Sequence, residues 1–329
     1  MASVSFMRVC RYRLDGETRI GFYYDERVVD LEALYMAYRS LGGERLAGDL
    51  ERLPVDPLFY LPPDGAGYAM ARRLKGFYES NLDKLDSPPI TLDVKTVKLL
   101  KPVLEPKKLI LLAGNYAEHV AESGDEIPDK RFTYPYFFMK PPSTTLTDPD
   151  DPILIPKTSP SCVDWEVELA AVVGRGGKHI RAEDALSHVA GYTILIDVSD
   201  RCLRLNPMRK PRPKDRFFDW LHGKWHDSFA PIGPCIASSD YIGNPQSLRL
   251  RLKVNGVVMQ DSSTSRMVFT VAELIEFISS FVTLEPGDII STGTPSGVGM
   301  ARGIYLRPGD VVEAYIEKIG LLRKRVEME

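Results

Sequence analysis

One stretch, from Val163 to Val173, constrains the fold of this chain more than any other. It reads V-D-W-E-V-E-L followed by the apolar run A-A-V-V, a pattern that favours a buried β-strand. Because side chains alternate between the two faces of a strand, Glu166 and Glu168 project from the same face. Neighbouring like charges destabilise a sheet, and the simplest counter-charge for several converging carboxylate oxygens is a divalent cation.

A second predicted strand supplies a third carboxylate. The run G-Y-T-I-L-I at 191–196 is apolar, partly β-branched and followed by Asp197. Glu166, Glu168 and Asp197 would form an all-oxygen site, which suits Mg²⁺, Mn²⁺ or Ca²⁺ better than zinc. The alternative is that Asp164, Glu166 and Glu168 line a solvated strand face, which is common for acidic residues at this spacing.

The composition is that of an ordinary globular protein. Of the 329 residues, 44% are hydrophobic and 26% are charged, and the length allows two domains. We place the boundary near residue 95, between a small N-terminal α/β domain (1–95) and a larger second domain (96–329). The net charge of −3 argues against nucleic-acid binding, and the basic, Pro-rich cluster at 209–214 predicts a solvated loop. No apolar run approaches the ~18 residues of a membrane span, so we expect no membrane partner.

The cysteines favour a reducing compartment. Cys10, Cys162, Cys202 and Cys235 lie far apart in the sequence and form no C-x-x-C pair. This pattern predicts neither a disulfide framework nor a zinc knuckle. The first residues also lack a secretory pattern, so we expect the protein in the cytoplasm.

Local patterns predict a mainly β chain. Residues 5–30 have the short β-prone runs and Asp-Gly turn of a β-meander. The clearest helix is 271–282, preceded by the capping-box pair Thr270 and Glu273. Helical spacing also occurs over 31–41 and 66–82. Many short strands with one strong helix in the second half indicate a β-rich domain rather than a doubly wound sheet.

A histidine and a glutamate follow the apolar run at 109–112 and a Gly-Asn turn. On a helix, residues three apart are neighbours, so His119 and Glu122 can hydrogen-bond. A carboxylate that orients an imidazole makes it a general base able to deprotonate water. The alternative is an ordinary surface His–Glu pair.

Two lysines and a glycine-rich segment supply candidate partners for negative charge. Lys140 precedes a Pro-Pro turn, and Lys224 lies in H-G-K-W. Both are typical of surface lysines, but a three-carboxylate pocket needs positive charge, and an ammonium can stabilise an oxyanion or enolate. The segment S-T-G-T-P-S-G-V-G at 291–299 offers backbone N–H groups and the Thr294 hydroxyl to a carboxylate. It lacks the spacing of a P-loop.

In chain order these motifs resemble the fumarylacetoacetate hydrolase family. The matching motifs are L-I-x-L-A-G-N-Y-x-x-H-x-x-E, F-M-K-P-x-S, V-D-W-E-V-E-L, G-Y-x-x-x-x-D-V-S-x-R, G-K-x-x-D-S-F-A-P-I-G-P, V-N-G and L-E-P-G-D-I-I-S-T-G-T-P-S-G-V-G. The resemblance runs from about residue 97 to the C-terminus. It implies an α+β, mainly β fold: a mixed β-sandwich roll for the catalytic domain, with 1–95 as the variable N-terminal domain.

The resemblance also assigns roles. It implies a Mg²⁺ or Mn²⁺ site at Glu166, Glu168 and Asp197, with Ca²⁺ as a substitute, and a homodimer. The catalytic residues it implies are His119 and Glu122, which activate water, and Lys224, which supports negative charge on the substrate. The substrate-binding residues it implies are Lys140, Arg201, Gln260, Gly293 and Thr294.

The implied function is a metal-dependent hydrolase that cleaves a C–C bond in an acylpyruvate-type 2-oxo acid, a small-molecule carboxylate. Decarboxylation, isomerisation, dehydration and ureidoglycolate lysis on the same scaffold stay open, as does a non-catalytic ligand sensor. Three features depart from the family pattern. Cys202 follows Arg201, Trp225 follows Lys224, and no fourth acidic ligand is found around 114–115.

Overall fold

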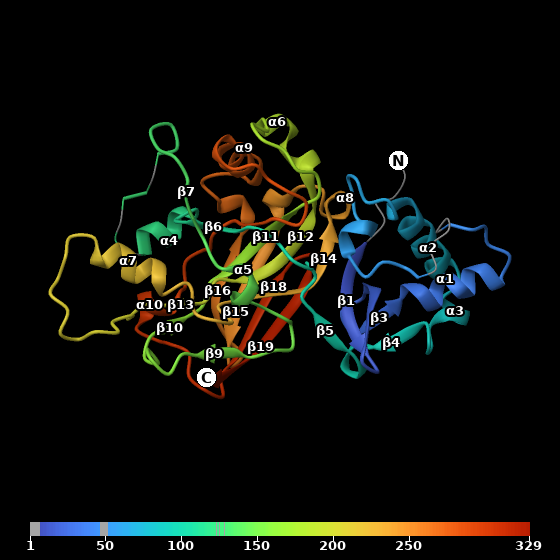
Figure 1. The fold of residues 1–329 in the computed structure, drawn as a ribbon, viewed down its shortest axis with the longest axis horizontal. Helices are drawn as coiled ribbons and strands as arrows, with labels where there is room; N and C mark the ends of the chain where they lie inside the picture. The colour runs from blue at the N-terminus through green and yellow to red at the C-terminus, as the bar shows by residue number, and fades with distance from the viewer. Residues whose placement is uncertain (1–6, 47–51, 123, 125, 128) are drawn as a thin grey trace.

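The described strands form a 12-stranded mixed sheet, a five-stranded second sheet and a two-stranded sheet, and the first two make up most of the protein (Figure 1). The structure is a computed structural model that describes residues 7–46, 52–122, 124, 126–127 and 129–329. In the large sheet the strand order is β4-β3-β2-β1-β14-β12-β11-β17-β6-β7, with β5 beside β1 and β8 beside β14. Its strands are β1 (Arg8–Leu14), β2 (Glu17–Tyr23), β3 (Arg27–Asp30), β4 (Thr91–Asp93), β5 (Lys98–Leu100), β6 (Leu109–Ala113), β7 (Tyr136–Met139), β8 (Leu146–Thr147), β11 (Val167–Val173), β12 (Val189–Ile196), β14 (Ala230–Ser238) and β17 (Ile289–Ser291).

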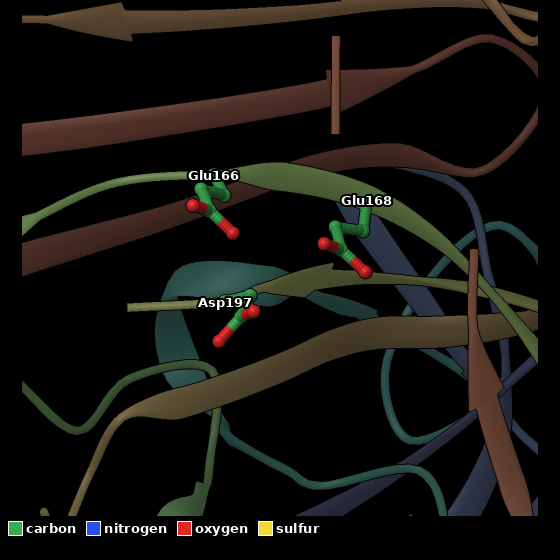
Figure 2. Close-up of side chains that lie close together, drawn as sticks. All are labelled: Glu166, Glu168 and Asp197. Carbon is green, nitrogen blue, oxygen red and sulfur yellow. The ribbon is translucent and has the colours of Figure 1, made fainter. Parts of the chain in front are cut away.

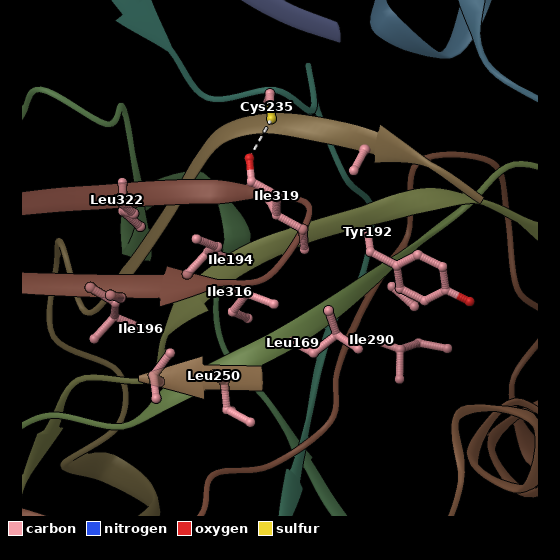
Figure 3. Close-up of a cluster of buried hydrophobic side chains, with 14 of the residues drawn as sticks. Leu169, Tyr192, Ile194, Ile196, Cys235, Leu250, Ile290, Ile316, Ile319 and Leu322 are labelled. Atoms are coloured by element: carbon pink, nitrogen blue, oxygen red, sulfur yellow. Dashed lines mark hydrogen bonds between the residues drawn. The ribbon is translucent and has the colours of Figure 1, made fainter. Parts of the chain in front are cut away.

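The second sheet has the order β16-β15-β18-β19-β9 and packs on the first through an apolar core. Its strands are β9 (Ile153–Ile155), β15 (Arg249–Val254), β16 (Val257–Ser263), β18 (Val311–Ile316) and β19 (Gly320–Met328). Figure 3 shows the core between the sheets, where Ile194 and Ile196 of β12 lie in one buried cluster with Leu250, Ile316 and Leu322. Removing this apolar surface from water stabilises the two-layer packing. The predicted mainly β, α+β architecture is confirmed.

The N-terminal strands extend the large sheet instead of forming a sheet of their own. The predicted meander is present as β1, β2 and β3, and its first turn places Asp15 and Gly16 at φ +50° and +82°. Positive φ at both central residues matches the right-handed twist of a hairpin. β1 then pairs with β14 of the second half of the chain, with Val9 opposite Ile236. The segment 1–95 therefore shares one continuous sheet with the rest of the protein.

The predicted strand from Val163 to Val173 is interrupted. Val163–Asp164 forms β10, which pairs with β13 (Ser199–Asp200), and the chain enters the large sheet only at Val167 as β11. Glu166 lies in the break, where its carbonyl accepts a hydrogen bond from the Asp197 N–H at 2.8 Å. The prediction of one continuous strand is therefore wrong, because the chain leaves one strand partner for another at this point.

The helices lie at the edges of the sheets (Figure 1). α1 (Leu31–Ser40) and α2 (Tyr68–Ser80) match the two helical patterns of the N-terminal half, and α9 (Val271–Phe281) begins with the predicted Thr270–Glu273 capping box. The other helices are α3 (Leu82–Leu85), α4 (Ala117–Glu122), α5 (Pro142–Thr145), α6 (Ala182–Ala185), α7 (Asp215–His222), α8 (Ser239–Ile242) and α10 (Gly299–Arg302). Among the described residues, none of the helices combines the length and the apolarity that crossing a bilayer requires.

The expectation that the cysteines stay unpaired is wrong for two of them. Cys162 and Cys202 form a disulfide with their Cα atoms 5.5 Å apart. They lie 40 residues apart in the sequence, and the pairing of β10 with β13 brings them together. Cys10 and Cys235 are buried free thiols.

Candidate active site

A cavity of about 1090 Å³ opens between α4, the segment 133–138 and the segment 200–224. Its inner surface includes Glu166 and Lys224, and its outer wall is formed largely by α7 and the loop before it. α4 and α7 lie on the same side of the molecule, away from the N-terminal helices (Figure 1). The cavity is large enough for a small organic substrate.

Three carboxylates converge behind the inner surface of this cavity (Figure 2). One oxygen from each of Glu166, Glu168 and Asp197 lies within 4.8 Å of the others. Asp197 directly follows β12, and Val167 pairs with Ile196 in the register between β11 and β12. This register places the ends of the two strands side by side and brings their acidic residues together. The side chains of all three residues are buried, so the alternative of a solvated strand face is wrong.

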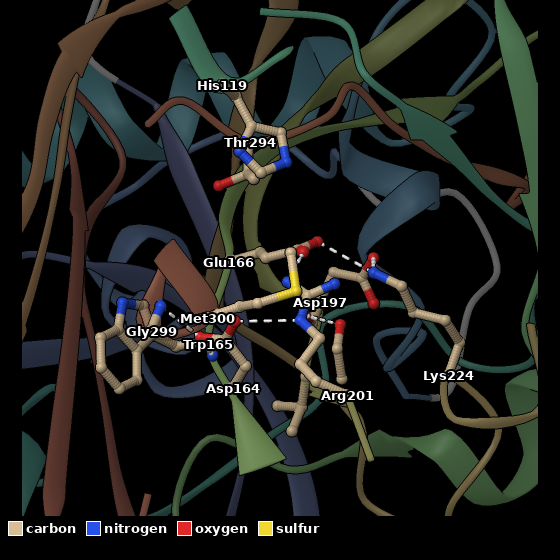
Figure 4. Close-up of polar contacts among 12 residues, drawn as sticks. His119, Asp164, Trp165, Glu166, Asp197, Arg201, Lys224, Thr294, Gly299 and Met300 are labelled. Atoms are coloured by element: carbon tan, nitrogen blue, oxygen red, sulfur yellow. Dashed lines mark hydrogen bonds and ion pairs between the residues drawn. The ribbon is translucent and has the colours of Figure 1, made fainter. Parts of the chain in front are cut away.

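Three cations neutralise most of this negative charge, and Figure 4 shows two of them, Lys224 and Arg201. The Lys224 ammonium lies 2.6 Å from Asp197 Oδ2 and 3.0 Å from Glu166 Oε2, and Lys140 Nζ lies 2.5 Å from Asp197 Oδ1. Arg201 pairs with Glu166 and, at 2.9 Å, with Asp164. The site is therefore a buried network of alternating charges.

The charge network changes the acidity of its members. Burial would raise the pKa of Glu166, but Lys224 and Arg201 outweigh it and hold that pKa far below its usual range. Burial also favours a neutral lysine, yet Asp197 and Glu166 raise the pKa of Lys224. At Lys140 burial prevails over Asp197 and lowers the pKa to about 8. Glu166 and Lys224 are thus held as an ion pair.

Glu168 provides the test of whether a cation fits here. Its Oε2 accepts hydrogen bonds from Ser291 Oγ at 2.5 Å and from the Gly293 N–H at 3.0 Å. Its Oε1 is buried with no hydrogen-bond partner among the described residues. Burial, together with Asp197 and Glu166, raises the pKa of Glu168 well above its usual range. A buried, unsatisfied oxygen beside two other carboxylates fits a hard divalent cation.

The His119–Glu122 pair has the predicted helical spacing and borders the same cavity. His119 Nδ1 lies 3.5 Å from Glu122 Oε2, and His119 lines the cavity together with Glu166 and Thr294. Both Glu122 oxygens accept from the Gly297 N–H, at 2.9 and 3.0 Å. The backbone therefore fixes the Glu122 carboxylate, which in turn orients the His119 ring through Nδ1.

The glycine-rich segment binds carboxylates of the protein itself. Its N–H groups at Gly293, Gly297 and Gly299 donate to Glu168, Glu122 and Asp164, respectively. Gly293 and Gly297 have φ of +87° and +103°, which other residues adopt only with strain. A Cβ on Gly297 would lie 2.0 Å from the Met259 carbonyl oxygen. The predicted capacity of this segment for carboxylates is thus used internally, to fix three acidic side chains.

The structure separates the predicted residues into two groups. Those that line the cavity are His119, Glu166, Arg201, Lys224 and Thr294. Six other predicted residues are not among the described residues that line the cavity: Glu122, Lys140, Glu168, Asp197, Gln260 and Gly293. The Gln260 amide is used within the protein. Its Oε1 accepts a hydrogen bond from the Val167 N–H at 3.0 Å, and its Nε2 donates to Thr294 Oγ1 at 2.9 Å and to the Pro295 carbonyl at 2.8 Å. These bonds connect the first residue of β11 to the glycine-rich segment.

Two features of the cavity were not predicted from the sequence. Asp164, considered only as part of a solvated face, is fully buried and accepts from Arg201 and from the N–H groups of Trp165, Gly299 and Met300. The basic segment predicted to be a solvated loop contributes Arg209 and Arg212 to the cavity. Its Pro-rich composition indicates a loop correctly but says nothing about which surface the loop covers.

Comparison with known proteins matches this fold and site. The family model described as fumarylacetoacetate (FAA) hydrolase C-terminal matches residues 108–327. The oxaloacetate tautomerase FAHD2B, mitochondrial, of Bos taurus is 41% identical over 312 residues, 92% of each chain. The 2,4-didehydro-3-deoxy-L-rhamnonate hydrolase of Sphingomonas sp. (strain SKA58) is 42% identical over 228 residues, 68% of this chain and 75% of that protein.

Solved structures agree over nearly the whole chain. The fumarylacetoacetate hydrolase of Exiguobacterium antarcticum superimposes with a TM-score of 0.72 and 30% identity, covering 98% of this chain and 100% of that one. The maleylpyruvate hydrolase of Sphingobium sp. SYK-6 gives a TM-score of 0.69 and 27% identity at the same coverage. The agreement includes the N-terminal segment, which lies outside the family model.

Proposed function

The chain belongs to the fumarylacetoacetate hydrolase family, and on this premise we propose that it is a divalent-metal-dependent hydrolase that cleaves a C–C bond in an acylpyruvate-type 2-oxo acid. Its relatives include hydrolases, isomerases and tautomerases, all of them enzymes. One observation carries the proposal. His119, which pairs with Glu122, and Glu166, which belongs to the carboxylate cluster, line one cavity.

Glu166, Glu168 and Asp197 would hold the cation, for which Mg²⁺ or Mn²⁺ is the proposed identity and Ca²⁺ a substitute. When bound, the cation would act as a Lewis acid toward the 2-oxo acid end of the substrate. The orphaned Oε1 of Glu168 and the all-oxygen donor set support this assignment.

The residues of the chain supply the proton transfers. His119, oriented by Glu122, takes a proton from a water molecule, whose oxygen bonds to the distal carbonyl carbon of the substrate. The bond between that carbon and C3 then breaks, and its electron pair stays on C3 as the enolate of pyruvate. The protonated His119 returns a proton, which gives pyruvate and a carboxylic acid. Lys224 sits at the edge of the cavity, where its positive charge stabilises the enolate.

A second candidate is the tautomerisation of oxaloacetate. It is favoured by the bovine relative, which is named for that reaction and matches over 92% of each chain. The same histidine would then move a proton between C3 and the 2-oxo oxygen, and no C–C bond would break. The two reactions share the removal or addition of a proton beside a stabilised enolate and differ in whether water adds to the substrate.

The purified protein with Mg²⁺ or Mn²⁺ tests both candidates. Release of pyruvate from acetylpyruvate is followed with lactate dehydrogenase, and the keto–enol conversion of oxaloacetate by ultraviolet absorbance. We expect pyruvate release, reduced at least 10³-fold in His119→Ala. Tautomerisation without release would favour the second candidate. If neither substrate reacts while both bind, the protein is a ligand sensor and the enzymatic proposal is wrong.

We also propose that the protein is a cytoplasmic homodimer. Exposed large apolar side chains near the cavity support an interface, among them Phe132, Met208 and Phe217, which are 84%, 86% and 56% exposed. Light scattering coupled to size-exclusion chromatography measures the oligomeric state.

Two observations bear on the cellular location. The Cys162–Cys202 disulfide weakens the argument that unpaired cysteines indicate a reducing compartment, and the bovine relative is named mitochondrial. Imaging of the tagged full chain in its own cells decides between the two compartments.

A further inference from the structure

The cations at the inner end of the cavity are already committed to carboxylates of the protein. Lys224 binds Glu166 and Asp197, and Arg201 binds Glu166 and Asp164. Both cations are almost completely buried in these pairs, at 3% and 8% side-chain exposure. A second carboxylate on a substrate would therefore have to find its counter-charge elsewhere.

Two arginines of the outer wall are also neutralised. Arg209 forms a two-pronged pair with Asp219, at 2.7 and 2.6 Å, and Arg212 Nε lies 2.9 Å from Asp215 Oδ1. Both aspartates belong to α7, so the helix holds the preceding loop against the cavity through these pairs. Arg209 and Arg212 therefore stabilise the outer wall, and their charges are already paired.

Arg204 and Arg216 remain. Both line the cavity and both are exposed, so each guanidinium is accessible from the cavity. Among the described residues neither has an acidic partner within ion-pair distance, and Arg204 makes only a hydrogen bond of 3.3 Å to the Pro207 carbonyl. Two acids without a lysine or arginine partner among the described residues also border the cavity: Glu126, which is exposed on the outer side, and Asp200, which is buried and lies 3.4 Å from His226. The unpaired charges therefore leave the outer wall with a net positive charge.

Aromatic side chains adjoin the inner end of the cavity. Trp220 of α7 packs edge-to-face on Phe138 with ring centroids 5.0 Å apart, Lys224 Nζ lies 5.8 and 5.2 Å from these two centroids, and both rings line the cavity with Phe269. The cavity thus offers an anionic cation site, apolar surface beside it and free guanidinium groups on the outer wall. A ligand that matches all three zones has a 2-oxo acid head, a hydrocarbon spacer and a terminal anion.

We infer that Arg204 and Arg216 bind a terminal carboxylate and thereby select 2-oxo diacids over 2-oxo monoacids. The inference rests on the proposed function, which places the 2-oxo acid head at Glu166, Glu168 and Asp197. Guanidinium groups suit this task because their planar fork matches a carboxylate with two parallel hydrogen bonds. The cavity of about 1090 Å³ leaves room for a spacer between the two ends.

Binding of matched ligands tests the inference without relying on turnover. The full chain with Mg²⁺ is titrated by calorimetry with two pairs of 2-oxo acids that differ only at the terminal group: 2-oxoglutarate against 2-oxopentanoate, and 2-oxoadipate against 2-oxohexanoate. We expect the preferred diacid to bind about tenfold more tightly than its monoacid partner, since exposed charge pairs contribute modestly. The double variant Arg204→Gln/Arg216→Gln should lose this preference and keep the affinity for the monoacids.

Two further variants separate the site from general effects of charge. Arg72→Gln removes an exposed arginine from α2, at the opposite end of the molecule from α7 (Figure 1), and should leave the preference unchanged. Arg204→Lys/Arg216→Lys keeps the charge without the fork and should retain only part of it. The inference is overturned if the wild type shows no preference for diacids in either pair, or if the preference survives in the double glutamine variant.

Turnover separates failure of this inference from failure of the proposed function. The substrates are 2,4-dioxoheptanedioate and 2,4-dioxoheptanoate, which again differ only in the terminal carboxylate. If the wild type prefers diacids in binding but releases pyruvate from neither substrate, the proposed hydrolysis fails and the role of the arginines stands. If it hydrolyses both with equal kcat/KM and shows no binding preference, the hydrolysis stands and the role of the arginines is wrong.

Discussion

The inner end and the outer wall of the cavity use the same kinds of side chain in different ways. At the inner end, Glu166 and Asp197 are buried beside the ends of β11 and β12, Lys224 is buried just after α7, and every cation contacts a carboxylate. On the outer wall, Arg204 and Arg216 are exposed on a loop and a short helix. The difference indicates a division of labour. If the proposals above hold, the buried groups at the inner end carry the reaction and the exposed arginines of the outer wall choose the substrate.

Burial decides how much each region contributes to free energy. Removing one member of a buried ion pair leaves an uncompensated charge and costs roughly 3–5 kcal/mol, whereas an exposed pair contributes roughly 0–1 kcal/mol. Substitutions at the inner end should therefore affect every substrate, and those on the outer wall should affect only the choice among substrates. The predictions below test this difference, from the largest expected effect to the smallest.

The largest effect is expected for Glu168→Gln at the inner end. The substitution keeps the shape of the side chain but removes the charge beside Glu166 and Asp197. We expect a loss of Mg²⁺ binding in calorimetry and a fall in kcat of at least about 10³-fold for diacids and monoacids alike. Glu183→Gln, at an exposed pair with Arg181, is the control and should behave as wild type. Near-full activity and metal occupancy in Glu168→Gln would show that the site is assigned wrongly.

The disulfide lies at the junction of the two regions. Cys202 lines the cavity next to Arg201, and its partner Cys162 precedes β10. Cross-linking residues 40 apart restricts the unfolded chain, so Cys202→Ser should lower the free energy of unfolding by about 2–4 kcal/mol. Denaturant unfolding with and without dithiothreitol measures the effect. The reductant should destabilise the wild type and leave Cys202→Ser unchanged; equal responses of the two proteins would exclude a stabilising bond.

The sequence predicted the inner end better than the outer wall, and the reason is local spacing. The pairs Glu166 with Glu168 and His119 with Glu122 are each close in sequence. Helical spacing on α4 brings the second pair together, and the first pair converges although Glu166 lies just before β11. The third carboxylate, that of Asp197, was predicted from its position at the end of an apolar run. The helix at 271–282 was equally visible, because its capping box is a local signal.

Contacts between distant segments could not be predicted in this way. The break at Trp165 and Glu166 depends on the pairing of β10 with β13, and the same pairing forms the disulfide. The basic loop at 209–214 is largely exposed, as predicted, but its position at the cavity, where Arg209 pairs with Asp219, could not be foreseen. No periodicity encodes such a position, since the loop is held by side-chain pairs rather than by a regular backbone pattern.

A smaller effect is expected at Asp164, which acts on the inner end through Arg201. Asp164→Asn keeps the shape of the side chain but removes the charge that orients the guanidinium against Glu166, and it replaces one accepting oxygen with an NH2 group that cannot accept from its N–H partners. We expect the affinity for Mg²⁺ to fall about 10–100-fold, with a smaller change in kcat at saturating metal. Asp261→Asn, in the exposed pair with Arg249, is the matched control and should change neither value. A loss of stability with unchanged metal affinity would assign Asp164 a purely structural role.

The smallest effect comes from a buried cation outside the cavity, Lys324. It donates to the Asp148 carbonyl at 2.7 Å and to Thr147 Oγ1 at 3.1 Å, and it has no ion pair among the described residues. Burial lowers its pKa from 10.5 to about 7, in contrast to Lys224, whose pKa the carboxylates raise. Between these two pH values the unfolded chain binds a proton that the folded chain does not, so stability should rise with pH.

The expected rise is about 1–3 kcal/mol from pH 7 to pH 9, measured by urea unfolding. Lys324→Met should remove most of this dependence and be the more stable protein near pH 7, because a methionine carries no charge to bury. Lys210→Met, at an exposed position, should leave the slope as in the wild type. A slope that persists in Lys324→Met would place the titrating group elsewhere. Loss of the slope in Lys324→Met would show that this protein buries lysines in two ways. Lys224 stays charged beside carboxylates at the inner end of the cavity, whereas Lys324, outside the cavity, loses its proton.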